Sequence, residues 1–184
     1  MDEILFVTER LWVRRATVDD VAMFYALWNE PQVMGNVGFP RGLGISREEI
    51  RAKIEAQGQT PFDGRLVVIS QATGERLGEA ALHRPDAEGI AETDVKLLPQ
   101  FWGHKYGVEV KRGLIEYLFT HTDCQAVQAT PNVNNIASIR MQEAVGGVRV
   151  GETFFEFPEA MGDKTVPVRA YIYHVRREDW ERSG

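Results

Sequence analysis

The chain has 184 residues, enough for one domain spanning residues 1–184 with its own apolar core, and its composition is that of a soluble globular protein. Its formal net charge of −6 argues against a nucleic-acid-binding surface, and no apolar run is long enough to cross a membrane. The single cysteine excludes an intrachain disulfide, and the first residues lack the features of a signal peptide. We therefore expect a cytoplasmic protein.

The first part of the chain predicts a strand, two capped helices and a loop between them. Apolar and polar side chains alternate over residues 10–15, which is typical of a half-buried strand. Two capping boxes follow, each a hydroxyl residue with an acidic residue three positions later, and each predicts the start of a helix. These helices are expected at 18–28 and 46–57, with a loop rich in glycine and proline at 35–44.

From residue 65 onward the pattern changes to strands, first as a meander and then alternating with helices. Strands are expected at 66–69, 76–83, 90–98, 126–130, 148–157 and 166–175, and helices from about 106 and at 134–144. This order predicts an α+β, or mixed α/β, fold with a central and partly antiparallel sheet.

Residues 98–109 are the most informative stretch. An apolar run ends at Pro99, a loop containing Gly103 follows, and an amphipathic pattern begins at about Tyr106. A strand, a turn and a helix start in this order direct free backbone N–H groups and a positive helix end to one point, which suits a phosphate or pyrophosphate. His104 and Lys105 add positive charge. The sequence lacks both the Gly-Lys-Ser/Thr ending of a P-loop and the ribose-binding acid of a dinucleotide fold.

Three blocks, in order along the chain, resemble the GNAT superfamily of N-acetyltransferases, and within it the branch of ribosomal-protein N-terminal acetyltransferases. Residues 102–109 resemble the acyl-CoA loop, and residues 132–138 resemble an Asn-x-x-Ser helix start. Residues 8–15, with the two aspartates that follow, resemble the family's opening. The resemblance implies a largely antiparallel, twisted central sheet flanked by helices.

The resemblance also implies an activity. The acetyl group of acetyl-CoA would pass directly to a primary amine, either a protein N-terminus or a small molecule, and two copies of the chain could form a homodimer. The alternative is a non-catalytic acyl-CoA-binding or regulatory module on the same fold. The sequence shows no metal site, because its four histidines lack ligand spacing.

By the resemblance, backbone holds most of the cofactor. A strand ending at Leu97 and Leu98 would pair with the pantetheine amides, the following loop would bind the pyrophosphate, and Asn135 would contact the pantetheine arm or merely cap its helix. The expected cofactor residues are Leu97, Leu98, Gly103, His104, Lys105, Tyr106, Gly107, Val108 and Asn135.

Lys105 and Gly147 depart from the family pattern, which has a glycine and an aromatic residue at these positions. The Lys105 side chain would either bring its ammonium to a phosphate or crowd the pyrophosphate. On the first hypothesis, Lys105→Gly weakens acetyl-CoA binding.

Two residues are expected to handle protons. Ser138 would protonate the leaving thiolate, unless it simply faces solvent, and Glu156 would be the general base, although it lies one residue out of register with the family. The other candidate bases are Glu79, Glu92 and Asp94, and any of these carboxylates could instead be an ordinary surface group. The acceptor site is expected around the early helices and the 35–44 loop, with Trp28, Met34 and Phe39 as lining or as core.

Overall fold

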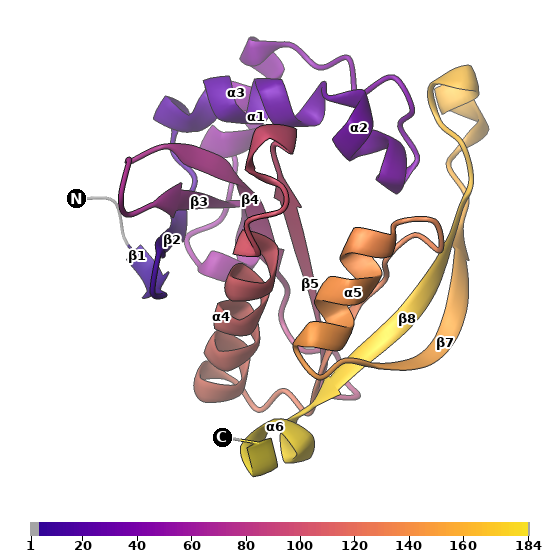
Figure 1. The fold of residues 1–184 in the computed structure, drawn as a ribbon. Coiled ribbons are helices and arrows are strands. Elements are labelled where there is room, and N and C mark those ends of the chain that lie inside the picture. Colours follow the sequence, from indigo (N-terminus) through magenta and orange to yellow (C-terminus); the bar gives the residue numbers. More distant parts are fainter. Residues whose placement is uncertain (1–3, 184) are drawn as a thin grey trace.

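The computed structural model describes residues 4–183, and their eight strands form one sheet (Figure 1). Residues 1–3 and 184 lie outside the described residues, so the single-domain assignment of 1–184 stays a prediction. The sheet order is β1-β2-β3-β4-β5-β6-β8-β7, and only β5 and β6 are parallel. The mixed, mostly antiparallel sheet expected from the sequence is therefore confirmed. The strands are β1 (Ile4–Val7), β2 (Leu11–Arg15), β3 (Leu66–Ser70), β4 (Arg76–Leu82), β5 (Ile90–Leu97), β6 (Ala126–Ala129), β7 (Val148–Phe155) and β8 (Val168–Arg176).

Helices lie on both faces of the sheet. Those of the described residues are α1 (Val21–Trp28), α2 (Pro31–Met34), α3 (Arg47–Glu55), α4 (Tyr106–His121), α5 (Ile136–Ala144) and α6 (Arg177–Ser183). Figure 1 shows α1 and α3 side by side on one face, with α4 on the other. Each face has its own apolar core: α4 buries Val110, Leu114 and Leu118, whereas α1 buries Phe24 and Leu27. None of the described helices is long and apolar enough to cross a membrane.

Three elements were not predicted from the sequence, namely β1, α2 and α6. The helix α2 is instructive, because Pro31 looks like the stop signal of the helix before it. Proline is equally suited to the first turn of a new helix, and here the Glu30 side chain accepts a hydrogen bond from the Gln32 N–H at 3.1 Å. The first predicted helix also begins three residues later, because residues 18–20 form a 3₁₀ turn.

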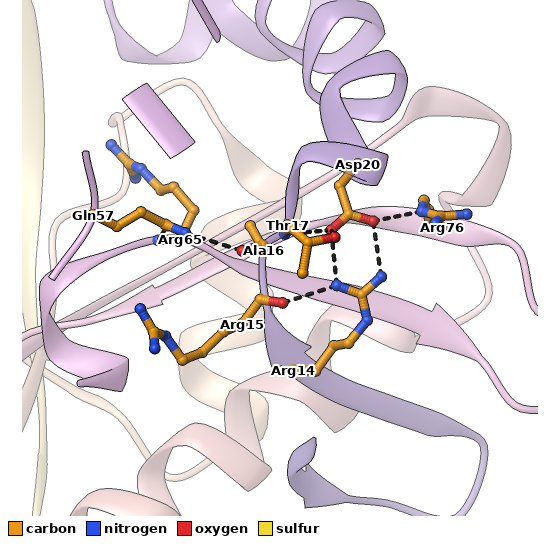
Figure 2. A network of polar contacts seen from close by, with 8 residues as sticks. All are labelled: Arg14, Arg15, Ala16, Thr17, Asp20, Gln57, Arg65 and Arg76. Atoms are coloured by element: carbon orange, nitrogen blue, oxygen red, sulfur yellow. Dashed lines mark hydrogen bonds and ion pairs between the residues drawn. The ribbon is translucent and has the colours of Figure 1, made fainter. Parts of the chain in front are cut away.

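A buried ion network fixes the point at which the chain leaves β2 for α1 (Figure 2). The Asp20 carboxylate is fully buried and accepts hydrogen bonds from both terminal nitrogens of Arg14, at 2.7 and 2.8 Å. Arg76 of β4 and the Thr17 N–H donate to it as well. Burial alone would raise the pKa of Asp20, but the bonds from Arg14, Arg76 and Thr17 bring it below its usual value.

Candidate active site

Strands β5 and β6 separate soon after they meet. They pair over only three residues, 90–92 of β5 with 126–128 of β6, whereas β5 continues to Leu97 paired with β4. Beyond Glu92, one edge of β5 therefore has no strand beside it in the described sheet.

The open edge carries backbone hydrogen-bonding groups. The Leu98 N–H donates to the Leu77 carbonyl of β4 at 2.9 Å. In an antiparallel ladder, alternate residues face opposite neighbours, so the backbone groups of Thr93, Val95 and Leu97 point away from β4, into the gap. Of the two residues expected to pair with pantetheine, Leu98 faces β4, and Leu97 faces the gap with its carbonyl already bonded to the Trp102 indole N–H. An open edge of this kind can pair with an extended chain of amides.

The loop after β5 leads directly to the N-terminus of α4. The Trp102 indole N–H bonds the Leu97 carbonyl at 2.8 Å and turns the chain back over the strand end. Gly103 then has a φ of 82° and Lys105 a φ of 62°, after which α4 begins at Tyr106. The first N–H groups of a helix lack partners within it, so those of residues 106–108 are available to an anion. The structure thus brings the expected stretch from Gly103 to Val108 together at the end of the open edge.

The second predicted block forms the start of α5. Asn135 is its N-cap, and the Oδ1 atom accepts a hydrogen bond from the Ser138 N–H at 3.1 Å. The capping role that the sequence allowed for Asn135 is therefore present. Both side chains are half-buried. The helix packs near the loop, since a Cβ placed on Gly107 would lie 3.0 Å from the Met141 sulfur.

A chain of charged groups lies on the α1 side of β5. Glu79 of β4 is buried, and its Oε1 accepts a hydrogen bond from the Trp28 indole at 3.0 Å and lies 3.4 Å from the Lys96 Nζ. Lys96 also bonds Asp94, whose side chain is 43% exposed and forms the outer end of the chain. The Glu79 Oε2 is the only buried side-chain polar atom without a hydrogen bond in residues 4–183, and it lies 3.8 Å from Arg65.

Comparison with known proteins places this geometry in a family. Residues 10–148 match the family model described as an acetyltransferase (GNAT) domain. The chain belongs to this family. An N-acetyltransferase of Bacillus licheniformis, p20, described as uncharacterized, is 25% identical over 148 residues, which cover 78% of this chain and 82% of that protein.

Two solved structures share the fold. The spermidine N-acetyltransferase of Vibrio cholerae, in complex with CoA and spermine, has a TM-score of 0.76 and 18% identity, covering 93% of this chain and 98% of that one. The aminoglycoside acetyltransferase AAC(6')-Ib, in complex with CoA and kanamycin, has a TM-score of 0.70 and 20% identity, covering 94% and 98%.

As a member of the GNAT family, the protein is an acetyl-CoA-dependent N-acetyltransferase. Membership therefore favours the enzyme over the non-catalytic module. The residues present fit acetyl-CoA: β5 offers an unpaired edge to its amide arm, and the N-terminus of α4 offers free N–H groups to its pyrophosphate. The finer branch of ribosomal-protein acetyltransferases is not established by these matches.

The Asp94 carboxylate of this GNAT enzyme lies among several positive charges. Burial alone would raise the pKa of Asp94, but the positive charges of Lys96, Arg65 and Lys111 bring it below its usual value. Burial would likewise lower the pKa of Lys96, and the two neighbouring carboxylates raise it instead. Asp94 and Lys96 are therefore both charged at neutral pH.

The other candidate bases lie elsewhere. Glu92 is exposed and accepts a hydrogen bond from Gln128 of β6 at 2.7 Å, where β5 and β6 are still paired. Glu156 follows the last residue of β7 and is exposed as well. No hydrogen bond joins Glu156 to Ser138 in residues 4–183; the Ser138 N–H bonds Asn135 instead.

The loop expected to receive the acceptor is joined to the far end of the sheet. Gly38 accepts a hydrogen bond from the Val166 N–H at 2.9 Å, and the rings of Phe39 and Phe157 pack edge to face with centroids 5.2 Å apart. Figure 1 shows the arm formed by β7 and β8 curving toward the α2 end of the molecule. Trp28 and Met34 belong to the core, so of the three expected lining residues only Phe39 lies at this junction.

Sequence reasoning gave no role to Arg10 and Glu109, although both lie in recognised blocks. The two side chains form an ion pair at 2.7 Å beside residues 103–105, the loop before α4 (hereafter the cofactor loop). The residues are 99 positions apart, and no local pattern signals such a contact.

Proposed function

We propose that this enzyme transfers the acetyl group of acetyl-CoA to a small primary amine carrying more than one positive charge. The observation that carries the proposal is the partly exposed Asp94 carboxylate on the α1 side of the open β5 edge. The formal net charge of −6 supports attraction of a cation. The ligands in the two related structures, spermine and kanamycin, are amines of this class.

Different groups of the chain hold the cofactor and the acceptor. Acetyl-CoA supplies the activated acetyl thioester, while the open edge of β5 and the N–H groups before Glu109 hold its amide arm and pyrophosphate. Asp94 attracts the acceptor ammonium, and Lys96 and Glu79 behind it fix its position. Because the pKa of Asp94 lies below its usual value, the carboxylate is a weak base: it orients the acceptor ammonium, and the proton that the ammonium loses passes on to solvent.

The other assignments made from the sequence complete the proposal. The Ser138 hydroxyl delivers a proton to the leaving thiolate, and Asn135 contacts the pantetheine arm through its amide nitrogen while its oxygen caps α5. Glu156 competes with Asp94 for the role of proton acceptor. It lies next to Phe157, which packs on the acceptor loop, so it could reach an amine from the opposite side.

The test is an acceptor panel measured by CoA release. Spermidine, spermine and kanamycin are compared with a monoamine and with short peptides that have free N-termini. We expect kcat/KM to be at least tenfold higher for the polycations. A preference for peptides would overturn the proposed acceptor class and would support the ribosomal-protein branch that the Asn-x-x-Ser block resembles.

Variants then identify the carboxylate. Asp94→Asn should lower kcat/KM for the amine by about 100-fold, within the range of general acid–base and positioning effects, and leave the Kd of acetyl-CoA unchanged. Glu92→Gln is the matched control, because it removes an exposed carboxylate two residues earlier on the same strand. If Glu156→Gln causes the large loss and Asp94→Asn does not, the role belongs to Glu156.

We also propose that two copies pair through β7. This strand is at the edge of the sheet, and Val148, Val150 and Phe154 on it are 45–61% exposed. Light scattering after gel filtration should give twice the chain mass, and Val150→Lys should give the monomer. A monomeric wild-type protein would contradict this assembly.

A further inference from the structure

Lys105 occupies a backbone conformation that is unusual for its residue type. It is the only residue other than glycine with a positive φ among residues 4–183, and it lies directly before the first residue of α4. A side chain at φ 62° is strained, and a strained residue persists only where its surroundings hold it in place. The neighbours of Lys105 therefore have to fix the loop.

Arg10 contacts the loop on both sides of Lys105. Its NH1 donates to the His104 carbonyl at 3.1 Å, and its guanidinium carbon lies 4.5 Å from the centroid of the Tyr106 ring. The His104 and Tyr106 rings stack on one another with centroids 5.6 Å apart. The residues before and after the strained position are thus held by one side chain from the start of β2.

Glu109 anchors that arginine. One carboxylate oxygen of Glu109 accepts from the Arg10 Nε at 2.7 Å, and the other accepts from the Arg10 backbone N–H at 2.8 Å and from the Thr8 hydroxyl at 2.5 Å. Burial would raise the pKa of Glu109, but these bonds bring it below its usual value. The carboxylate is therefore ionised at neutral pH and keeps the arginine over the loop.

We propose that Arg10 is a positioning residue for acetyl-CoA. Its bond to the His104 carbonyl holds that oxygen away from the anion, and its stacking on Tyr106 fixes the first turn of α4. The N–H groups of residues 106–108 are then oriented before the ligand arrives, despite the strained Lys105. This inference depends on the proposed role of the loop in binding pyrophosphate.

The experiment measures binding and turnover of the full-length protein. Arg10→Ala should raise the Kd of desulfo-CoA, measured by calorimetry, at least tenfold, and should raise KM for acetyl-CoA with kcat changed less than twofold. Turnover of S-acetylpantetheine, which has no pyrophosphate, should not change. Arg10→Lys keeps the charge without the guanidinium fork and should recover less than half of the loss.

The Lys105→Gly substitution tests whether the affinity lost in Arg10→Ala is due to backbone strain at Lys105. In the Arg10→Ala background it should restore part of the affinity, whereas in the wild-type background it should weaken binding because a charge is lost. Arg182→Ala is the matched control, since Arg182 is an exposed arginine paired with acidic residues on α6. It should leave the Kd unchanged.

The outcomes separate the two proposals. Lys105→Glu places a negative charge on the loop and should weaken desulfo-CoA binding at least tenfold if the loop binds pyrophosphate. If Lys105→Glu weakens binding and Arg10→Ala does not, the positioning role is wrong. If neither variant changes the Kd, the loop is not the pyrophosphate site. Should Arg10→Ala fail to fold by thermal denaturation, Arg10→Gln and Arg10→Lys replace it, and an unchanged Kd in both overturns the role of Arg10.

Discussion

The two faces of the sheet treat buried charges differently. On the face covered by α1 and α3, the buried carboxylates of Asp20 and Glu79 lie beside cations. On the face covered by α4, the buried ammonium of Lys111 donates a hydrogen bond to the uncharged Thr93 hydroxyl. Burial lowers the pKa of Lys111 to about 7, and the charge of Asp94 opposes this only in part. The α1 face thus stabilises the charged forms of its buried groups, whereas the α4 face disfavours the charged form of Lys111. The difference follows from the partners: arginine and lysine side chains neutralise the buried carboxylates, whereas Lys111 has, among the described residues, only an uncharged hydroxyl within hydrogen-bonding distance.

The largest expected effect comes from removing the buried charge of Asp20 on the α1 face. Asp20→Asn should lower the free energy of unfolding by about 3–5 kcal/mol, because it leaves buried arginine without its carboxylate. Urea denaturation at pH 7 measures this, with Asp19→Asn, an exposed neighbour, as the control. Because the pKa of Asp20 is lowered in the folded protein, its contribution should be present above pH 4 and lost in more acidic solution. A change below 1 kcal/mol would show that the network contributes little.

Removing the buried charge of Lys111 should instead raise the free energy of unfolding. Between pH 7 and 10.5 the unfolded chain holds a proton at Lys111 that the folded protein does not, so stability rises with pH at about 1.4 kcal/mol per unit. Lys111→Met should therefore stabilise the protein most below pH 7, and its advantage should fall by about 2–3 kcal/mol between pH 6 and pH 9. Denaturation at the two pH values measures this, and a constant difference would contradict a neutral Lys111.

A smaller effect should be confined to the acceptor side. Phe157→Ala removes the ring that packs on Phe39, and we expect KM for the amine to rise about tenfold, or about 1.4 kcal/mol. KM for acetyl-CoA should stay the same, since the cofactor loop is built elsewhere. Phe155→Ala, a more exposed phenylalanine two residues earlier, is the control. Equal changes in both KM values would mean that the two sides of the site are coupled.

The smallest effect should appear at the loop itself. Lys105→Gly should raise the free energy of unfolding by about 1 kcal/mol, because glycine adopts a positive φ without the strain of a side chain. The same variant should weaken acetyl-CoA binding severalfold through loss of the ammonium. Urea denaturation and calorimetry of the same sample separate the two results. Tighter binding would favour the alternative that Lys105 crowds the pyrophosphate.

The loop and the start of α5 could be predicted because their signals are local. The break at Pro99, the glycines of the loop and the amphipathic pattern after Tyr106 lie within a dozen residues, and the Asn135 cap lies within four of Ser138. Helix and turn geometry relate such neighbours directly. The sequence by itself therefore determined the mixed sheet, the likeness to acetyltransferases and all helices and strands except β1, α2 and α6.

The tertiary structure decided which of these elements meet. Whether β5 and β6 stay paired depends on the twist of the whole sheet, so no local pattern places the open edge at residues 93–97. The same holds for Arg10 beside Glu109 and for Trp28 beside Glu79, pairs that lie far apart in the chain. The surroundings then set how each charged side chain behaves: two arginines compensate the buried Asp20, Asp94 stays partly accessible, and burial lowers the pKa of Lys111 to about 7. These properties belong to the surroundings of a side chain, and only the folded chain supplies them.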